Sequence, residues 1–364
     1  MVGRKKGKRI IFAGGGTGGH VFMAVAITQY LRDQDPGVGI RFVGTPGGME
    51  NRILPALGID LDTLEVGKLK RVGLLKGVST LLHLPGSLLK ARRILKSFSP
   101  SLVVGLGGYS SGPVVLAAAW MGIPCLLIEP NSQPGLTNRL LSRWVDRAAV
   151  AFEESVRWFG SKARLTGIPV RKEFYQVPEM GLTSGPLQVL VFGGSQGSQA
   201  INSLVCEALP FLSAESVRFV HQTGPADYSR VKRCYDSRGF PGAVVPFISA
   251  MPGYFSRADL IVSRSGASTV AEIAAAGRPS ILIPFPYAAD DHQRKNALAL
   301  ERQNAALVIE QAKATGRDLA TMLTALGEDR ERLRAMAAAS RRVSRPDSVN
   351  RIAQVMDELP TREN

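Results

Sequence analysis

Cysteine is scarce in this sequence, with three among 364 residues: Cys125, Cys206 and Cys234. They are widely spaced and odd in number, so they do not fit a disulfide framework. No Cys or His pair has the spacing of a zinc site either. We therefore expect free thiols in a reducing compartment, no bound metal and no cofactor.

Long apolar runs are also missing. No stretch approaches the roughly 18–20 uninterrupted apolar residues of a membrane span. The N-terminus is basic, but the apolar run at residues 10–13 meets glycines at once and is too short for the core of a signal peptide. Hydrophobic residues make up 45% of the chain and charged residues 21%, as in a folded protein. We therefore expect a cytoplasmic chain with two or three domains.

Several catalytic signatures are absent as well. The chain contains neither the phosphate-loop pattern G-x-x-x-x-G-K-[ST] nor the nucleophile elbow G-x-S-x-G. A D-x-D pattern occurs at residues 33–35 and 60–62, but such short matches are frequent by chance. They give no reason to expect a metal-dependent reaction.

Acidic side chains are outnumbered by basic ones, 30 to 45, which gives a net charge of +15. This balance favours an anionic partner, but no nucleic-acid recognition motif accompanies it, so we expect no nucleic acid. Basic residues flank a leucine-rich stretch. The basic residues are Lys68, Lys70, Arg71, Lys76, Lys90, Arg92, Arg93 and Lys96. The leucines are Leu74, Leu75, Leu81, Leu82, Leu84, Leu88 and Leu89. Two interpretations stay open: a patch for an anionic membrane surface, or a solvated helix whose leucine stripe faces the core.

Short apolar runs alternate with glycine turns and helical stretches, which is βαβ alternation and predicts parallel sheets. Strands are expected at residues 9–13, 40–43, 102–105, 123–128, 187–192, 217–221, 243–246, 260–263 and 280–284. The pattern restarts after a Pro- and Gly-rich segment, 167–185, that we interpret as a linker. We expect an α/β protein with two Rossmann-like domains, 1–170 and 180–340, and a final helix at 347–358.

The first glycine loop runs from Gly14 to Gly19 and is followed by His20. It contains G-x-G-x-x-G, but the second expected strand ends Val43-Gly44-Thr45 without the acidic residue that a dinucleotide fold requires. His20 is unusual there. At the start of a helix the dipole favours a neutral imidazole, which is able to take a proton as a general base. The alternative is a histidine that only caps the helix or packs.

Two other glycine-rich loops, at residues 105–112 and 193–198, each join an expected strand to a helix. Their amides are suited to phosphate groups, although each could be a plain turn. The segment 264–277 carries Ser268, Thr269 and Glu272 into another helix, where Glu272 could accept both ribose hydroxyls or simply favour the helix start. Gln293 follows the next strand and could read sugar hydroxyls.

Taken in order, seven motifs resemble the MurG family of bacterial N-acetylglucosaminyltransferases over nearly the whole chain. They are GGTGGH at 15–20, GGYSSGP at 107–113, EPN…PGLTNR at 129–139, TGIPVR at 166–171, GGSQGS at 193–198, RSGASTVAEIAAAG at 264–277 and DDHQ…NA at 290–297. The pairing of the first with the sixth is specific; a single glycine loop is not.

The resemblance implies a GT-B fold and an inverting, metal-independent transfer of N-acetylglucosamine from UDP-N-acetylglucosamine. The acceptor is the 4-hydroxyl of undecaprenyl-diphosphate-linked MurNAc-pentapeptide, in peptidoglycan synthesis and hence in cell shape and division. It also implies a peripheral enzyme at the cytoplasmic face of the inner membrane. The donor is expected on the second domain, the acceptor diphosphate at the glycine loops of the first, and the final helix against the first.

Residue by residue, the resemblance makes His20 the candidate base, with Glu129 in reserve. Donor contacts fall on Glu272 for the ribose, Ser195 and Gln196 for the phosphates, and Ile248 and Met251 for the uracil. The remaining substrate-binding candidates are Thr17, Gly18, Gly19, Asn131, Arg171, Ser268, Thr269 and Gln293. Two other functions remain open: a UDP-sugar 2-epimerase of the same fold, and a non-catalytic protein that binds nucleotide sugar or anionic lipid.

Overall fold

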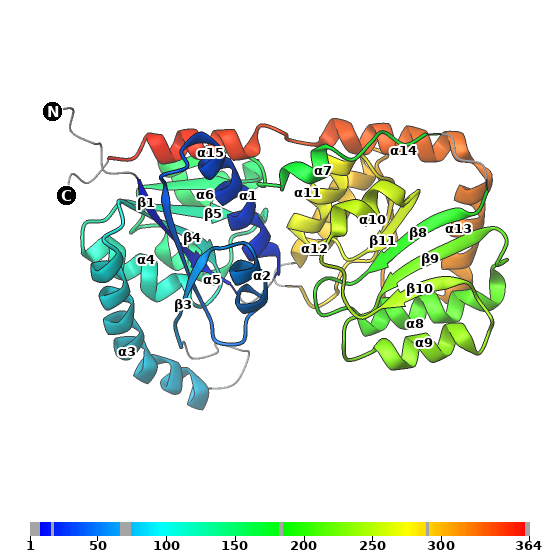
Figure 1. Cartoon of the computed structure of the whole chain (residues 1–364), viewed down its shortest axis with the longest axis horizontal. Helices are drawn as coiled ribbons and strands as arrows, with labels where there is room; N and C mark the ends of the chain where they lie inside the picture. Colours follow the sequence, from blue (N-terminus) through cyan, green and yellow to red (C-terminus); the bar gives the residue numbers. More distant parts are fainter. Residues whose placement is uncertain (1–7, 16–17, 66–73, 182–184, 289–290, 361–364) are drawn as a thin grey trace. The chain divides into compact units, whose positions relative to one another are not determined.

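The computed structural model describes residues 8–15, 18–65, 74–181, 185–288 and 291–360, and for 74–83 only the course of the backbone. The chain divides into two compact units, 1–171 with 347–364, and 172–346 (Figure 1). Each unit is built on its own parallel sheet. The two Rossmann-like halves expected from the βαβ alternation are therefore present.

The first unit has a seven-stranded sheet in the order β3-β2-β1-β4-β5-β6-β7. Its strands are β1 Arg9–Gly14, β2 Gly39–Gly44, β3 Asp60–Thr63, β4 Leu102–Gly107, β5 Cys125–Glu129, β6 Arg147–Val150 and β7 Ala163–Leu165. Its helices are α1 Gly18–Gln34, α2 Glu50–Ala56, α3 Leu74–Phe98, α4 Ser111–Trp120, α5 Leu136–Leu141, α6 Glu153–Phe159 and α15 Ser348–Asp357. The short 3₁₀ turn Gly160–Lys162 precedes β7.

Alternate residues of β1 serve opposite faces of this sheet, because successive side chains of a strand point to opposite sides. Ile10 and Phe12 belong to a core that includes residues of α1 and α15. Ile11 and Ala13 belong to another, with residues of α3 and α4. Both faces are therefore covered, and α15 lies beside α1 although more than 300 residues separate them in the chain (Figure 1).

The second unit has a six-stranded sheet in the order β10-β9-β8-β11-β12-β13. Its strands are β8 Leu187–Phe192, β9 Val217–Gln222, β10 Gly242–Val245, β11 Leu260–Ser263, β12 Ser280–Leu282 and β13 Ala306–Val308. Its helices are α7 Lys172–Tyr175, α8 Gln199–Ala208, α9 Tyr228–Asp236, α10 Met251–Arg257, α11 Ala267–Ala276, α12 His292–Glu301, α13 Gly316–Glu328 and α14 Arg330–Val343, with a 3₁₀ turn at Leu209–Phe211.

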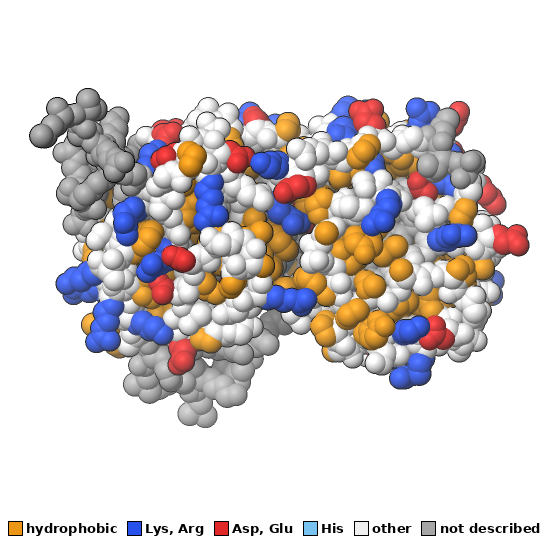
Figure 2. All heavy atoms as spheres, in the orientation of Figure 1, with side chains coloured by type: hydrophobic (Ala, Val, Ile, Leu, Met, Phe, Trp, Pro, Cys, Tyr) orange, Lys and Arg blue, Asp and Glu red, His pale blue; other side chains and the backbone are white. Residues whose placement is uncertain are grey.

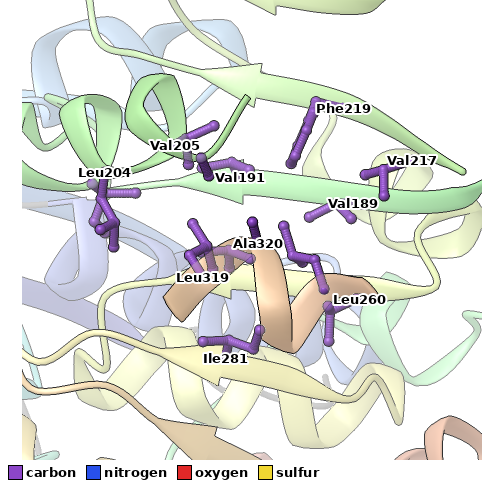
Figure 3. Packing of buried hydrophobic residues seen from close by; sticks show 14 of the residues in the cluster. Val189, Val191, Leu204, Val205, Val217, Phe219, Leu260, Ile281, Leu319 and Ala320 are labelled. Carbon is purple, nitrogen blue, oxygen red and sulfur yellow. The ribbon is translucent and has the colours of Figure 1, made fainter. Parts of the chain in front are cut away.

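One face of the second sheet packs on α8 and α13. Figure 3 shows Leu319 and Ala320 of α13 among side chains of the central strands, including Val189 and Leu260. Helix α13 begins with a capping box, in which Thr315 and Asp318 satisfy each other's backbone amides. The core of the unit is thus continuous across the sheet and fixes where the strands end.

The segment 167–185 is not the plain linker expected from its prolines and glycines. It contains α7, and Phe174 is fully buried with its ring 5.0 Å from that of Phe255 in an edge-to-face pair. The guanidinium of Arg278, also buried, donates to the carbonyls of Pro178 and Phe255. Burial and backbone hydrogen bonding therefore fasten residues 172–178 to the second unit.

Candidate active site

In the first unit the glycine loops after β1 and β4 lie side by side, because these two strands are paired and Gly14 stands opposite Gly107. Helix α1 begins at Gly18, two residues earlier than expected, so Gly18, Gly19 and His20 form its first turn. Thr17 lies outside the described residues. The carboxyl ends of the two strands thus present His20 beside the β4–α4 loop.

His20 is held over the loop that precedes it. Its Nδ1 lies 3.5 Å from the carbonyl oxygen of Gly15. A carbonyl can only accept a hydrogen bond, so this contact places the proton of the neutral ring on Nδ1 and leaves the lone pair on Nε2. A Cβ built on Gly107 would lie 3.7 Å from that Nε2. The basic atom therefore faces the β4–α4 loop.

The pKa of His20 is lowered by burial, which outweighs the opposing effects of the Gly15 carbonyl and the charge of Glu50. The expected consequence, a neutral imidazole, is the same as that inferred from the helix dipole, but desolvation is the larger cause. A neutral histidine of this kind can accept a proton near neutral pH.

Glu129, at the end of β5, is buried and accepts four hydrogen bonds. The donors are Asn131 N and Nδ2, Gly135 N and Asn138 Nδ2, at 2.9 to 3.1 Å. Burial raises its pKa against these donors. The Glu129 oxygens hold the loop that carries Asn131, and they also hold the side chain of Asn138. The side chains of Asn138 and His20 both lie next to Gly107. This geometry makes Glu129 an organiser of the loop and weakens its case as the base.

Two buried hydroxyls mark the N-terminus of α4. The side chains of Ser110 and Ser111 are fully buried, and neither Oγ has a hydrogen-bond partner in the part of the chain that the structure describes. Buried polar groups are usually satisfied, so these two hydroxyls are exceptions among the described residues. Arg171 stands elsewhere in this unit, with its guanidinium 4.2 Å from the ring centre of Phe22 on α1.

In the second unit the loop 193–198 follows β8, and the loop 264–266 follows its neighbour β11. Arg264 joins them: its Nη2 donates to Ser198 Oγ at 2.8 Å, and its Nη1 donates to the carbonyls of Ile283 and Pro284 beyond β12. Ser198 in turn caps α8. Ser195 and Gln196 lie on this braced loop, Gln196 with an exposed side chain.

Helix α11 starts at Ala267, which places Ser268 and Thr269 in its first turn and Glu272 in its second, partly exposed. Glu272 is therefore past the positions where the dipole stabilises an acid most, so helix stability is a weak reason for its presence. Two hydrogen bonds hold Gln293 on α12. Its side-chain Oε1 accepts from Phe285 N, and its backbone carbonyl accepts from Ser265 Oγ. These candidates thus follow the carboxyl ends of β8, β11 and β12.

Ile248 and Met251 follow β10, the edge strand of the second sheet. Ile248 is buried, whereas Met251 opens α10 and is partly exposed. Between this edge and β11, Gln222 donates to the carbonyl of Gly194 at 3.0 Å and ties β9 to the loop 193–198. All second-unit candidates therefore lie in loops, or in the first two turns of helices, that follow strands at one end of the sheet.

Among the described residues, no group of three His, Cys, Asp or Glu side chains is arranged to hold a metal ion. No described helix combines the length and the apolar character needed to cross a bilayer. The D-x-D pair Asp60 and Asp62 lies on β3, where both carboxylates face Arg41.

Two parallel sheets of this kind, each with glycine-rich loops at its strand ends, fit the GT-B class of glycosyltransferases. The sequence matches the family described as glycosyltransferase family 28 N-terminal domain over residues 10–150, and the corresponding C-terminal domain over residues 188–352. The chain is a glycosyltransferase of this class.

Its relatives narrow the class. A protein of Syntrophotalea carbinolica named UDP-N-acetylglucosamine–N-acetylmuramyl-(pentapeptide) pyrophosphoryl-undecaprenol N-acetylglucosamine transferase is 42% identical over 351 residues, 95% of this chain and 98% of that one. One of the same name from Syntrophus aciditrophicus is 46% identical over 274 residues, 74% and 76% of the two chains. The crystal structure of Acinetobacter baumannii MurG superposes with a TM-score of 0.74 at 31% identity, covering 96% of this chain and 99% of that one. The chain belongs to the MurG family.

A putative UDP-N-acetylglucosamine 2-epimerase from Listeria monocytogenes has a similar fold, with a TM-score of 0.70 over 96% of both chains. Its sequence is only 12% identical, so this likeness is one of fold alone. The fold is common to both classes of enzyme, and the sequence separates them.

Proposed function

We propose that this protein transfers N-acetylglucosamine from UDP-N-acetylglucosamine to the 4-hydroxyl of undecaprenyl-diphosphate-linked MurNAc-pentapeptide, a step of peptidoglycan synthesis. The observation that carries the proposal is the relative of that name, 42% identical across 95% of this chain. The arrangement of polar side chains at the strand ends of both units supports it.

The donor binds the second unit. Glu272 accepts the ribose hydroxyls, because one carboxylate can receive two hydrogen bonds. Ser195 and Gln196, with the first turn of α11 at Ser268 and Thr269, receive the diphosphate, where amide donors and the helix dipole favour negative charge. Ile248 and Met251 contact the uracil, and Gln293, held from both ends, reads the sugar hydroxyls.

The acceptor diphosphate binds at the glycine loops of the first unit. The N-terminus of α1 at Gly18 and Gly19 supplies amides. Asn131, oriented by Glu129, lies on the loop after β5 and contacts the reacting sugars. Arg171 provides a cation for the donor.

The reaction is a single displacement with inversion. The acceptor oxygen forms a bond to the anomeric carbon while the bond from that carbon to the UDP oxygen breaks, and the acceptor proton passes to Nε2 of His20. UDP leaves with its charge stabilised by backbone amides and Ser195. Burial keeps His20 neutral before the transfer, as a base must be.

Exposed side chains of the first unit support a membrane-facing surface there. Trp120 and Trp144 form an edge-to-face pair with centroids 6.4 Å apart, and they are 60% and 48% exposed. Leu140 is 66% exposed and Leu89 59%. Exposed aromatic and leucine side chains suit the interfacial zone of a bilayer.

Leu89, Trp120 and Leu140 lie on helices α3, α4 and α5, and Trp144 lies in the turn that follows α5. Helix α4 contacts both α3 and α5. Exposed basic side chains on the same helices and just beyond them, among them Lys90, Arg93 and Arg143, add attraction to anionic headgroups. Within the leucine-rich stretch, Leu88 packs against the core while Leu84 and Leu89 are exposed, and the side chains of the other four leucines lie outside the described part of the chain. On the face seen in Figure 2, Lys and Arg side chains are spread over both units. We therefore place the protein peripherally on the cytoplasmic face of the inner membrane.

The decisive experiment measures UDP release from UDP-N-acetylglucosamine in EDTA, with and without a lipid-linked MurNAc-pentapeptide analogue. Acceptor-dependent release establishes a transferase that needs no divalent ion. Formation of a 2-epimer without acceptor would replace the proposal with the epimerase. Binding of the donor without turnover would replace it with the non-catalytic alternative.

A further inference from the structure

Glu50 is a fully buried carboxylate next to the first glycine loop, and the proposed mechanism gives it no role. It is the first residue of α2 and follows the turn after β2. Its Oε1 accepts hydrogen bonds from Thr45 N at 2.7 Å and from Thr45 Oγ1 at 2.9 Å. Burying a carboxylate is costly without such partners, so this side chain is held in one place.

The carboxylate fills a space that three glycines leave open, Gly15, Gly44 and Gly48. A Cβ built on Gly15 or on Gly48 would overlap the oxygens of Glu50. Gly15 belongs to the loop before α1, and Gly48 to the turn before α2. Glu50 therefore packs between the two loops in direct contact with the backbone of each.

The same Gly15 carries the carbonyl that faces His20 Nδ1. A continuous path thus runs from Glu50 through the Gly15 backbone to the imidazole. The negative charge of Glu50 also raises the pKa of His20, in opposition to burial. When His20 takes a proton it becomes a cation in a poorly hydrated site, where a nearby fixed anion has its largest effect.

Other titratable groups border the same loops. Glu129 lies behind Asn138, Tyr109 follows β4 with an exposed ring, and Arg52 stands on the exposed side of α2. Glu129 is saturated by four donors that stabilise its charge locally. Among these groups Glu50 is the buried anion that contacts the loop of His20.

We propose that Glu50 is a positioning residue for His20: its carboxylate supports the loop that orients the imidazole and stabilises the imidazolium formed during transfer. The inference rests on the proposed function and adds a residue to it. It differs from a simple role at the start of α2, which would affect folding but not the protonation of His20.

Two substitutions in the full chain separate shape from charge. Glu50→Gln keeps the volume and one acceptor for Thr45 but removes the charge, and Glu50→Asp keeps the charge but shortens its reach. Glu153→Gln is the matched control, since Glu153 also lies in the first turn of a helix of this unit but is exposed.

We expect Glu50→Gln to lower kcat about 10- to 100-fold with little change in KM for UDP-N-acetylglucosamine. The acidic limb of the kcat profile should move to lower pH, because removal of the anion makes His20 less basic. Glu50→Asp should keep that limb near its wild-type position, and Glu153→Gln should change neither value.

A Glu50→Gln variant with lower stability but an unmoved acidic limb would overturn the inference and leave a structural role. Titration of His20 by NMR in wild type and Glu50→Gln gives the same answer without turnover: equal midpoints refute the inference. If wild type itself shows no acceptor-dependent UDP release, the proposed function fails, and that result is distinct from equal titration midpoints.

Discussion

Arg264 Nη2 donates a 2.8 Å hydrogen bond to Ser198 Oγ, so a guanidinium at the end of β11 supports the cap of α8 and the loop before it. The same nitrogen donates to Gln311 Oε1 at 2.7 Å. Burial lowers the pKa of Arg264 to about 10, which leaves it charged at neutral pH. Arg264 thus braces the loop that carries Ser195 and Gln196 without needing to touch the donor.

Replacement of Arg264 by alanine should therefore weaken donor binding. Loss of the brace leaves Ser198 and two carbonyls without this donor, at a cost of about 1–3 kcal/mol each where they stay buried. We expect kcat/KM for UDP-N-acetylglucosamine to fall about 10- to 100-fold and the melting temperature to drop. Steady-state kinetics and calorimetry measure both. Lys232→Ala, which removes an exposed ion pair with Asp236, is the control and should change neither appreciably. Unchanged KM and kcat in the Arg264 variant would contradict the bracing role.

Glu272→Ala tests the ribose contact. A hydrogen bond to a charged group contributes about 1.5–3 kcal/mol, so KM for the donor should rise about 10- to 100-fold. The 2′-deoxy donor gives the sharper comparison. Wild type should discriminate against it, whereas the variant should bind both donors almost equally because the acceptor of that hydroxyl is gone. Equal discrimination by the two proteins would remove Glu272 from the ribose site.

The sequence predicts the central strands of both sheets and the edge strand β10, but it misses four short strands. β1 and β8 lie inside their sheets and are buried on both faces, so they read as continuous apolar runs. β3, β6, β7 and β13 were not predicted: each has only three or four residues, and β3 reads Asp-Leu-Asp-Thr at a sheet edge. Short strands of this kind are specified by their neighbours rather than by their own pattern.

The same division holds for the candidate site. Glycine loops are visible in the sequence because they need particular residues at fixed spacing, and the structure places them at strand ends. Their supports were not predicted. Arg264 reaches Ser198 across 66 positions, and Glu50 reaches Gly15 from another helix. The sequence did mark Arg264 and Asn138, because both lie inside the seven motifs. A single sequence, however, does not reveal which residues they contact.

His20 and Glu129 should behave differently when each is replaced. His20→Ala removes the proposed base, and kcat should fall about 100- to 10,000-fold while donor binding is retained. Glu129→Gln keeps the shape but turns one acceptor into a donor facing donors, so we expect lower stability and a smaller loss of kcat. Single-turnover rates and donor binding by calorimetry separate the two. Near-normal turnover in His20→Ala, with a large loss in Glu129→Gln, would instead make Glu129 the base.

Membrane association should depend on the exposed apolar side chains of the first unit. Trp120→Ser combined with Leu140→Ser removes two side chains that are 60% and 66% exposed, so folding should change little. Binding to vesicles that contain anionic lipid should weaken about tenfold or more, as measured by sedimentation. Phe211→Ser, at a 48% exposed phenylalanine of the second unit, is the control. Equal binding by the double variant and wild type would refute this surface.

His221 makes the stability of the second unit dependent on pH. It is fully buried on β9, with Nε2 3.0 Å from Asn202 Oδ1 and Nδ1 3.2 Å from Tyr235 OH. An amide oxygen can only accept, so Nε2 carries the proton and Nδ1 accepts from the tyrosine. Burial lowers the pKa of His221 to about 3, against the raising effect of Asp227.

Unfolding returns this pKa to about 6.5, so between about pH 3 and 6.5 the unfolded chain binds the extra proton. Stability contributed by the neutral histidine is therefore complete above about pH 6.5 and is lost as the pH falls, by up to about 1.4 kcal/mol per pH unit. His221→Phe should lower stability at pH 7, because Asn202 and Tyr235 lose a partner, yet flatten its dependence between pH 7 and 5. His292→Gln removes a partly exposed histidine of the same unit as a control. Thermal unfolding at several pH values measures this dependence. If the stability of His221→Phe falls with pH as steeply as that of wild type, groups other than His221 cause the loss at low pH.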